Sequence, residues 1–163
     1  MRVLTSLITA SFLLFNTMVS NTSTEDYYPK IIDAFQLAYD AMYNGDNAPK
    51  KDFIILDMES FYFLDTTYED RMKLMEHFKK YGKKVLNASS VKLKEIGLID
   101  ENGNIIIDGD LLMMTNVYSK GEGNLVIEGT KYHSPIAAYL YRITFKRDKG
   151  PWEIEKIEDL GVA

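Results

Sequence analysis

The spacing of apolar residues changes near residue 98, and this change constrains the fold of the 163-residue chain more than any other feature. Before it, apolar side chains recur every three or four residues, which is the spacing of one helix face. After it, apolar and polar residues alternate between closely spaced turn signals, as they do in antiparallel strands. We therefore predict an α+β domain with N-terminal helices packed on one face of a curved antiparallel β-meander.

The clearest helix has an apolar stripe that runs from Tyr28 to Met42, and Asn44-Gly45 is a suitable C-terminal stop. Two short apolar clusters follow, at 53–56 and 61–64, which we interpret as one short strand and a turn. Periodicity alone does not separate strand from buried helix in runs this short.

The second predicted helix begins at Thr66, because Thr66 and Glu69 have the spacing of a capping box. Its expected apolar stripe consists of Tyr68, Met72, Met75 and Phe78. A third, short helix is expected after Ser89, with Gly97 as its stop. The residues of this helix expected to point inward are Leu93 and Ile96.

The predicted strands of the meander are 105–118, 124–133, 136–147 and 152–158. Residues 137–145 give the clearest alternation. The side chains expected on one face of this strand are Ala137, Tyr139, Tyr141, Ile143 and Phe145. The connecting turns are too short for parallel crossovers, so the strands should be antiparallel.

The N-terminus has the pattern of an export signal, with Arg2 before the apolar run Val3–Phe15 and polar residues after it. We predict a signal peptide at 1–20, a polar leader at 21–26 and a single domain at 27–163. The protein is then secreted or extracytoplasmic. Met18 is a poor residue for a cleavage site, so the alternative is an uncleaved N-terminal anchor, the one case in which a membrane is involved.

Composition excludes several classes of function. The chain has 19 basic and 24 acidic residues, with lysines scattered among acids, so we expect no nucleic-acid partner. The absence of cysteine excludes disulfides, thiol nucleophiles and zinc–thiolate sites. Two histidines cannot form a three-histidine metal centre. We expect neither a metal nor a cofactor.

Residues 100–111 match part of a calcium-binding loop. The match fails where Ile105 replaces the turn-forming glycine and where Leu111 replaces the bidentate glutamate. A hairpin turn at Asn102-Gly103 explains the same residues, and we prefer it.

Aromatic side chains with polar groups can line a ligand pocket. The candidate ligand-binding residues are Tyr118, Tyr132, His133, Tyr139 and Tyr141. The alternative is that this aromatic stripe is simply the core face of the sheet.

No catalytic residue can be assigned. Ser134 follows His133 directly, but adjacent strand residues point to opposite faces, so the pair is not expected to act as a triad. His77 is expected at the solvent edge of the second helix. Burial beside apolar segments raises a carboxyl pKa. The carboxylates placed for such acid–base work are Asp33, Asp40, Asp57, Glu59 and Glu128.

The tail at 141–154, with an alternating strand, a basic Gly-containing turn and Trp152-Glu-Ile154, resembles the closing hairpin of the NTF2-like superfamily. This resemblance implies a cystatin-like cone, in which a curved sheet wraps a long helix, and the chain also looks like a small exported bacterial protein of that shape. The superfamily includes isomerases, dehydratases and non-catalytic binding modules. None of its catalytic motifs matches here, so the resemblance transfers no functional residue.

We therefore expect an exported, non-catalytic binding or interaction domain whose partner is a protein or small-molecule ligand outside the cytoplasm. The alternative is a small-molecule isomerase- or hydrolase-like enzyme that uses a buried carboxylate in the cone. A third possibility is a structural or inhibitory partner of a cell-surface protein, paired through a sheet edge.

Overall fold

The computed structural model describes residues 30–163. The predicted signal peptide, the polar leader and Tyr28 lie outside the described residues. The elements, in chain order, are α1 (Ile31–Asn44), β1 (Phe53–Leu56), η1 (Phe61–Phe63), α2 (Tyr68–Phe78), η2 (Lys79–Tyr81), β2 (Lys84–Asn87), α3 (Ser90–Glu95), β3 (Gly109–Gly121), β4 (Asn124–Ser134), β5 (Ala137–Lys146) and β6 (Glu153–Val162).

The strands form one six-stranded sheet in the order β2-β1-β3-β4-β5-β6. The long strands β3 to β6 are antiparallel neighbours, which confirms the predicted meander and the α+β class. The sheet is nevertheless mixed, because β1 is parallel to both β2 and β3. The chain between β1 and β2 contains α2, and parallel strands require a long crossover of this kind. The parallel strand β2 was not predicted, and the first predicted meander strand begins at Gly109 rather than at residue 105.

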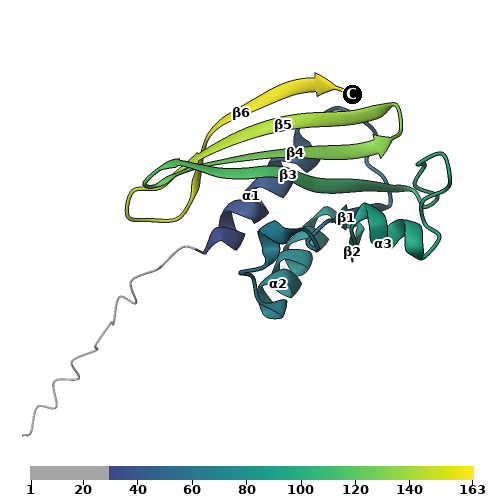
Figure 1. Cartoon of the computed structure of the whole chain (residues 1–163), viewed down its shortest axis with the longest axis horizontal. Coiled ribbons are helices and arrows are strands. Elements are labelled where there is room, and N and C mark those ends of the chain that lie inside the picture. The colour runs from purple at the N-terminus through teal and green to yellow at the C-terminus, as the bar shows by residue number, and fades with distance from the viewer. Residues whose placement is uncertain (1–29) are drawn as a thin grey trace, which may run out of the picture.

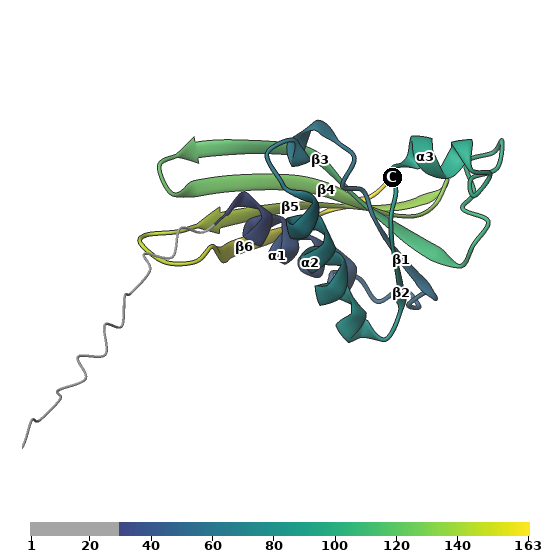
Figure 2. The same cartoon turned by 90° about the horizontal axis from the view of Figure 1, so that it is seen from below.

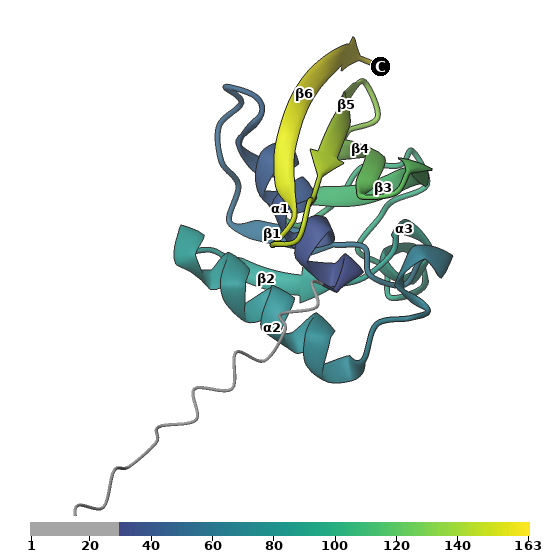
Figure 3. The same cartoon turned by 90° about the vertical axis from the view of Figure 1, so that its left-hand side faces the viewer.

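The helix α1 lies against one face of the meander, which we call the inner face, and it contacts all four long strands. Figure 1 shows α1 below β3–β6, and Figure 3 shows the strands curving around it. The buried side chains between them include Tyr39, Met42, Leu112, Ile127 and Ile143. Burial of such apolar area is the main stabilising contribution to this layer.

The helix α1 packs closely on the sheet at Gly129 of β4. A Cβ at this position would lie 2.4 Å from Met42 Sδ and 2.8 Å from the Met113 carbonyl oxygen. A side chain here would therefore displace the end of Met42 and collide with the backbone of β3.

Within residues 30–163, the opposite, outer face is covered by the short helix α3 and by the segment 98–107 that follows it. Leu93 of α3 packs with Ile55 and Leu111 in a second, smaller core. Figure 2 shows α2 and α3 on opposite sides of β1 and β2. None of the helices formed by residues 30–163 therefore covers most of the outer face of β4–β6.

The start of α2 differs from the prediction by one residue. Its N-cap is Thr67 rather than Thr66, and the capping box is completed by Asp70 rather than Glu69. Thr67 Oγ1 accepts from the Asp70 amide at 3.1 Å, and Asp70 Oδ2 accepts from the Thr67 amide at 3.1 Å. The predicted stripe is partly wrong: the side chains that α2 exposes include Tyr68 and Met72, and those it buries are Asp70, Leu74 and Phe78. Packing against α1, rather than apolar spacing alone, selects the buried face.

The short helix α3 has the predicted N-cap, since Ser89 Oγ accepts from the Lys92 amide at 3.1 Å. Leu93 is buried as expected, whereas Ile96 is 54% exposed and does not point inward. On β5, the buried residues Tyr141, Ile143 and Phe145 confirm the predicted alternation.

Candidate functional site

Charged side chains are buried on the inner face, where β3 and β4 carry Asp110 and Lys131. Both side chains are fully buried. Strand alternation puts Lys131 on the same face as Ile127, and its partner across the ladder is Leu112 of the inner core. Two further residues, Asp46 and His133, complete what we call the inner-face ion cluster.

Lys131 stands at the centre of this cluster. Its Nζ lies 2.9 Å from Asp46 Oδ2 and 3.6 Å from Asp110 Oδ2. The other oxygen of Asp110 lies 2.8 Å from His133 Nδ1. Asp110 Oδ2 has no hydrogen-bond partner within residues 30–163, so it is stabilised by ionic attraction to Lys131. Charges removed from water require this kind of pairing.

Asp46 reaches the cluster because the chain leaves α1 directly against β5. A Cβ on Gly45 would lie 2.5 Å from the ring of Tyr141, so only glycine allows this approach. Tyr141 donates from its hydroxyl to Asp46 Oδ2 at 3.3 Å. Burial raises the pKa of Asp46, but hydrogen bonds from Lys131 and the Ala48 amide outweigh it, so the pKa is lowered. Burial raises the pKa of Tyr141, and the neighbouring Asp46 raises it further.

The cluster is closed by two more lysines. Lys50 donates to the Tyr43 carbonyl oxygen and lies 4.5 Å from the centre of the Tyr43 ring. Lys51 donates to the His133 carbonyl oxygen at 3.1 Å. His133 is the most accessible member of the cluster, with 27% of its side chain exposed. The cluster connects the end of α1 to β3, β4 and β5. Its buried charges pair with one another and so have a structural role.

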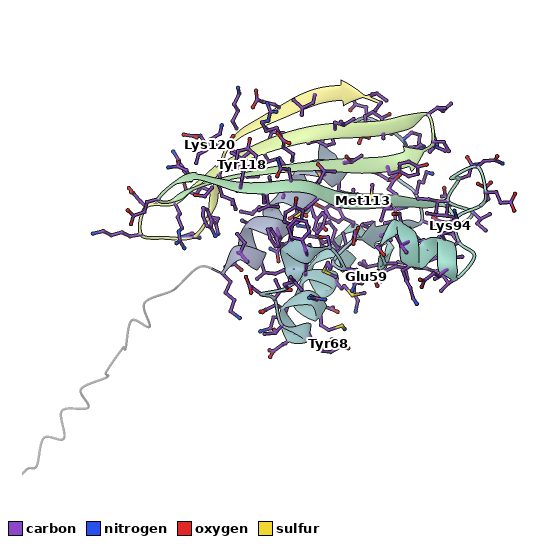
Figure 4. All side chains as sticks on the ribbon, in the orientation of Figure 1. Glu59, Tyr68, Lys94, Met113, Tyr118 and Lys120 are labelled. Atoms are coloured by element: carbon purple, nitrogen blue, oxygen red, sulfur yellow. The ribbon has the colours of Figure 1, made fainter. Side chains whose placement is uncertain are left out.

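A cleft of about 390 Å³ lies on the outer face, between α3 and the strands β3 and β4. We call it the outer-face cleft. Its floor is formed by Leu111, Met113 and Tyr132, with α3 on one side and the loop at 100–103 on the other. Figure 4 marks Lys94 on α3 and Met113 on β3 at this end of the molecule. The volume falls within the range of small-molecule sites.

Two charged side chains of the outer-face cleft differ from those of the ion cluster, because they are available to bind a ligand. Lys94 and Glu101 both line the cleft, and neither side chain has an ion-pair or hydrogen-bond partner within the described part of the chain. Asp100 is already used: its carboxylate accepts from the amides of Asn102 and Asn104 at 2.9 and 2.8 Å. Tyr132 donates to the Gly103 carbonyl oxygen at 2.8 Å, which fixes the loop against the floor.

The five candidate ligand-binding residues do not lie in one pocket. Tyr141 and His133 meet at the ion cluster, and Tyr139 lies on the same inner face, opposite Lys131. Tyr132 belongs to the floor of the outer-face cleft. Tyr118 is also on the outer face, opposite Val126 on β4, and does not line this cleft.

Of the candidate carboxylates, Asp57 has the environment expected of an acid–base group, since burial raises its pKa. Hydrogen bonds from Ser89 lower the pKa of Glu59. Asp33 accepts from the Lys30 amide at 3.0 Å, and Glu128 pairs with Arg142 at 2.7 Å. Asp33 therefore stabilises the start of α1, and Glu128 links β4 to β5.

Asp40 and His77 form a second polar contact, between α1 and α2. Burial would raise the pKa of Asp40, but hydrogen bonds from Lys80, Tyr81 and His77 lower it overall. His77 was expected at the solvent edge, and 27% of its side chain is exposed, with Nε2 2.7 Å from Asp40 Oδ2. This contact joins the two helices of the inner layer.

The calcium-like sequence forms a turn, as the hairpin interpretation predicted. Ile99 and Ile105 make an antiparallel bridge around it, and Asp100 accepts the amides inside the turn. Within residues 30–163 no group of three or more acidic, histidine or cysteine side chains is placed to hold a metal ion.

Sequence reasoning missed Asp46, Asp110 and Lys131. A signal for the lysine was present, because it continues the alternation of Leu125 and Ile127 and so falls on a core position. The pairing itself depends on contacts between residues far apart in the chain, as the separation of Asp46 from Lys131 illustrates.

The fold defines the class of the protein as an α+β domain with helices on a six-stranded mixed sheet. No protein-family model, curated protein or solved structure matches the chain. Among the helices formed by residues 30–163, none has the length and apolar character needed to span a membrane.

Proposed function

We propose that the protein is an exported, non-catalytic binding domain and that its ligand is a small molecule held in the outer-face cleft. The observation that carries this proposal is the cleft itself, with an apolar floor and two charged side chains, Lys94 and Glu101, that have no partner within residues 30–163. Small-molecule sites combine these two features. Export rests on the N-terminal run Val3–Phe15 after Arg2.

The proposal includes an NTF2-like or cystatin-like ancestry for the fold. Support comes from the curved antiparallel strands around α1 and from the closing turn, where Arg147 lies 4.8 Å from the centre of the Trp152 ring. The parallel strands β1 and β2 are an addition to that plan. With Leu111 of β3, they form the outer-face core on which α3 rests, so they support one part of the proposed site, whereas its floor belongs to β3 and β4 of the meander.

A neutral apolar probe, 2-naphthol, tests the binding function by NMR titration of the ¹⁵N-labelled domain. We expect saturable shifts in the amides of Leu111, Met113 and Tyr132. Met113→Trp, which fills the cleft, should abolish them. Tyr118→Trp is the matched control, since it adds the same ring on the same face of β3 outside the cleft. Equal binding by both variants would show that the probe sits elsewhere.

A second candidate function, hydrolase- or isomerase-like catalysis, is favoured by one observation. Asp110 is fully buried and orients His133 through Nδ1, while the imidazole remains partly exposed. A carboxylate in this position can hold the ring for general-base work. Hydrolysis of p-nitrophenyl acetate by the wild type and by His133→Gln tests it. Catalysis requires a rate above buffer that the substitution removes, and equal rates would exclude His133 from this reaction.

A further inference from the structure

The outer-face cleft has opposite charges at its two sides, and this arrangement points to the kind of ligand it takes. Lys94 is on α3 and Glu101 is on the loop across the cleft. They do not form an ion pair with each other, and neither is neutralised by another side chain within residues 30–163. A ligand between them therefore meets one cation and one anion.

The side that carries Lys94 also carries a hydroxyl group. Ser90 and Lys94 are four residues apart on α3, so they lie on the same face of the helix, and both line the cleft. The neighbouring Lys92 pairs with Glu95 at 3.4 Å, whereas the ammonium group of Lys94 has no partner among the residues that the structure describes. An ammonium and a hydroxyl together suit a ligand carboxylate.

The opposite side suits an ammonium group. Asp100 keeps both carboxylate oxygens within its own turn, where they accept from Asn102 and Asn104. The side chain of Glu101, the next residue, has no such partners among residues 30–163, so its charge is available to a ligand. Between the two sides, Leu111, Met113 and Tyr132 present an apolar and aromatic floor.

We infer that the outer-face cleft binds a free α-amino acid with an apolar side chain. The carboxylate lies at Lys94 and Ser90, the ammonium at Glu101, and the side chain on the floor. The inference rests on the proposed binding function and adds the ligand class to it. The cleft volume of about 390 Å³ is near the lower end of the range for ligand pockets, which favours a ligand of this size over a larger one.

Four compounds with the same side chain separate the contributions of the two ligand charges to binding: phenylalanine, its amide, N-acetylphenylalanine and N-acetylphenylalanine amide. Phenylalanine carries both charges, its amide only the ammonium, N-acetylphenylalanine only the carboxylate, and the last compound neither. N-acetylphenylalanine also imitates the C-terminal end of a peptide, and the amide imitates an N-terminal end. We expect phenylalanine to bind most tightly in NMR titrations, with each charge contributing about two- to fivefold in Kd, as for partly exposed ion pairs.

Two variants assign the charges to their residues. Lys94→Met should weaken phenylalanine and N-acetylphenylalanine about two- to fivefold and leave the amide unchanged. Glu101→Gln should weaken phenylalanine and its amide and leave N-acetylphenylalanine unchanged. Both residues are at the surface, so the variants should fold like the wild type.

The outcomes distinguish this inference from the function on which it rests. If 2-naphthol and all four compounds bind the cleft but with equal Kd, the cleft binds small molecules and the amino-acid inference is overturned. Tighter binding of N-acetylphenylalanine than of phenylalanine would also overturn it, in favour of a peptide end. If neither 2-naphthol nor any of the four compounds perturbs the cleft, the binding function itself fails.

Discussion

The two faces of the sheet use charged residues in opposite ways. On the inner face, Asp110 and Lys131 are fully buried, and Lys131 pairs with both Asp110 and Asp46. On the outer face, Lys94 and Glu101 line a cleft without partners within residues 30–163. A buried charge is tolerated only when it is paired, whereas a charge at a cleft remains available to a ligand. The inner face therefore holds the fold together, and the outer face is where binding is expected.

The largest effect on stability is expected for a substitution of Lys131 on the inner face. Lys131→Met leaves Asp46 and Asp110 without their shared cation, and we expect a loss of about 3–5 kcal/mol in the free energy of unfolding. Urea denaturation at neutral pH measures it. Lys94→Met is the matched control on the outer face, where the same substitution should change stability by less than about 0.5 kcal/mol. Similar losses in the two variants would contradict the division of roles.

The packing of α1 on the inner face provides the next largest effect. Gly129→Ala should cost about 1–3 kcal/mol in the free energy of unfolding, because the new methyl group meets Met42 and the Met113 carbonyl. Gly150→Ala serves as the control, since a Cβ there would meet nothing within 4 Å. Thermal denaturation of both variants is the measurement. An unchanged midpoint for Gly129→Ala would mean that α1 does not lie this close to β4.

The capping box of α2 makes part of the inner layer sensitive to acid. Hydrogen bonds from Lys30 and Thr67 lower the pKa of Asp70 to about 2, below the value of about 3.9 for an unfolded chain. Its stabilisation is therefore complete above about pH 4 and is lost as the pH falls towards 2. Asp70→Asn should cost about 1 kcal/mol at pH 7. The difference from the wild type should shrink between pH 4 and pH 2, and a constant difference would contradict the assignment.

The smallest effect is expected on the outer face, at Tyr132→Phe. The substitution removes the hydrogen bond to the Gly103 carbonyl oxygen and should cost about 0.5–1 kcal/mol. Tyr39→Phe is the inner-face counterpart, because Tyr39 is fully buried and donates to the Asp57 carbonyl oxygen at 2.6 Å. It should cost more, because Tyr39 is fully buried and water cannot replace the lost donor, whereas Tyr132 is partly exposed. Urea denaturation of the two variants ranks them directly.

Much of the fold follows from local pattern. The stripe that ends at Met42 and the alternation from Tyr139 to Phe145 depend on a single buried face, and both were predictable for that reason. The strand β2 was not, because Lys84–Asn87 is short and half polar, and it pairs with β1 only through a crossover. The cap of α2 was misplaced by one residue because Thr66 and Thr67 both satisfy the local rule. Packing decided between them.

The candidate site shows the same division. Tyr132 and His133 were singled out together from one strand segment, yet they serve opposite faces of the sheet. Their functional separation follows from strand alternation, but which face carries a cleft does not. Asp46, which joins His133 in the ion cluster, and Lys94, which lines the cleft with Tyr132, had no recognisable pattern in the sequence. An aspartate after a helix and a lysine within one are ordinary surface residues.

The sequence by itself determined the class of fold, the positions of α1 and of the meander, and the exclusion of cysteine chemistry, because each of these depends on composition or on short-range periodicity. Only the tertiary structure decided that Lys131 is buried between two aspartates, while Lys94 lies beside a cleft with no side-chain partner from residues 30–163. The physical reason is that the charge of a lysine is set by its chemistry, but its desolvation and its partners are set by residues distant in the chain.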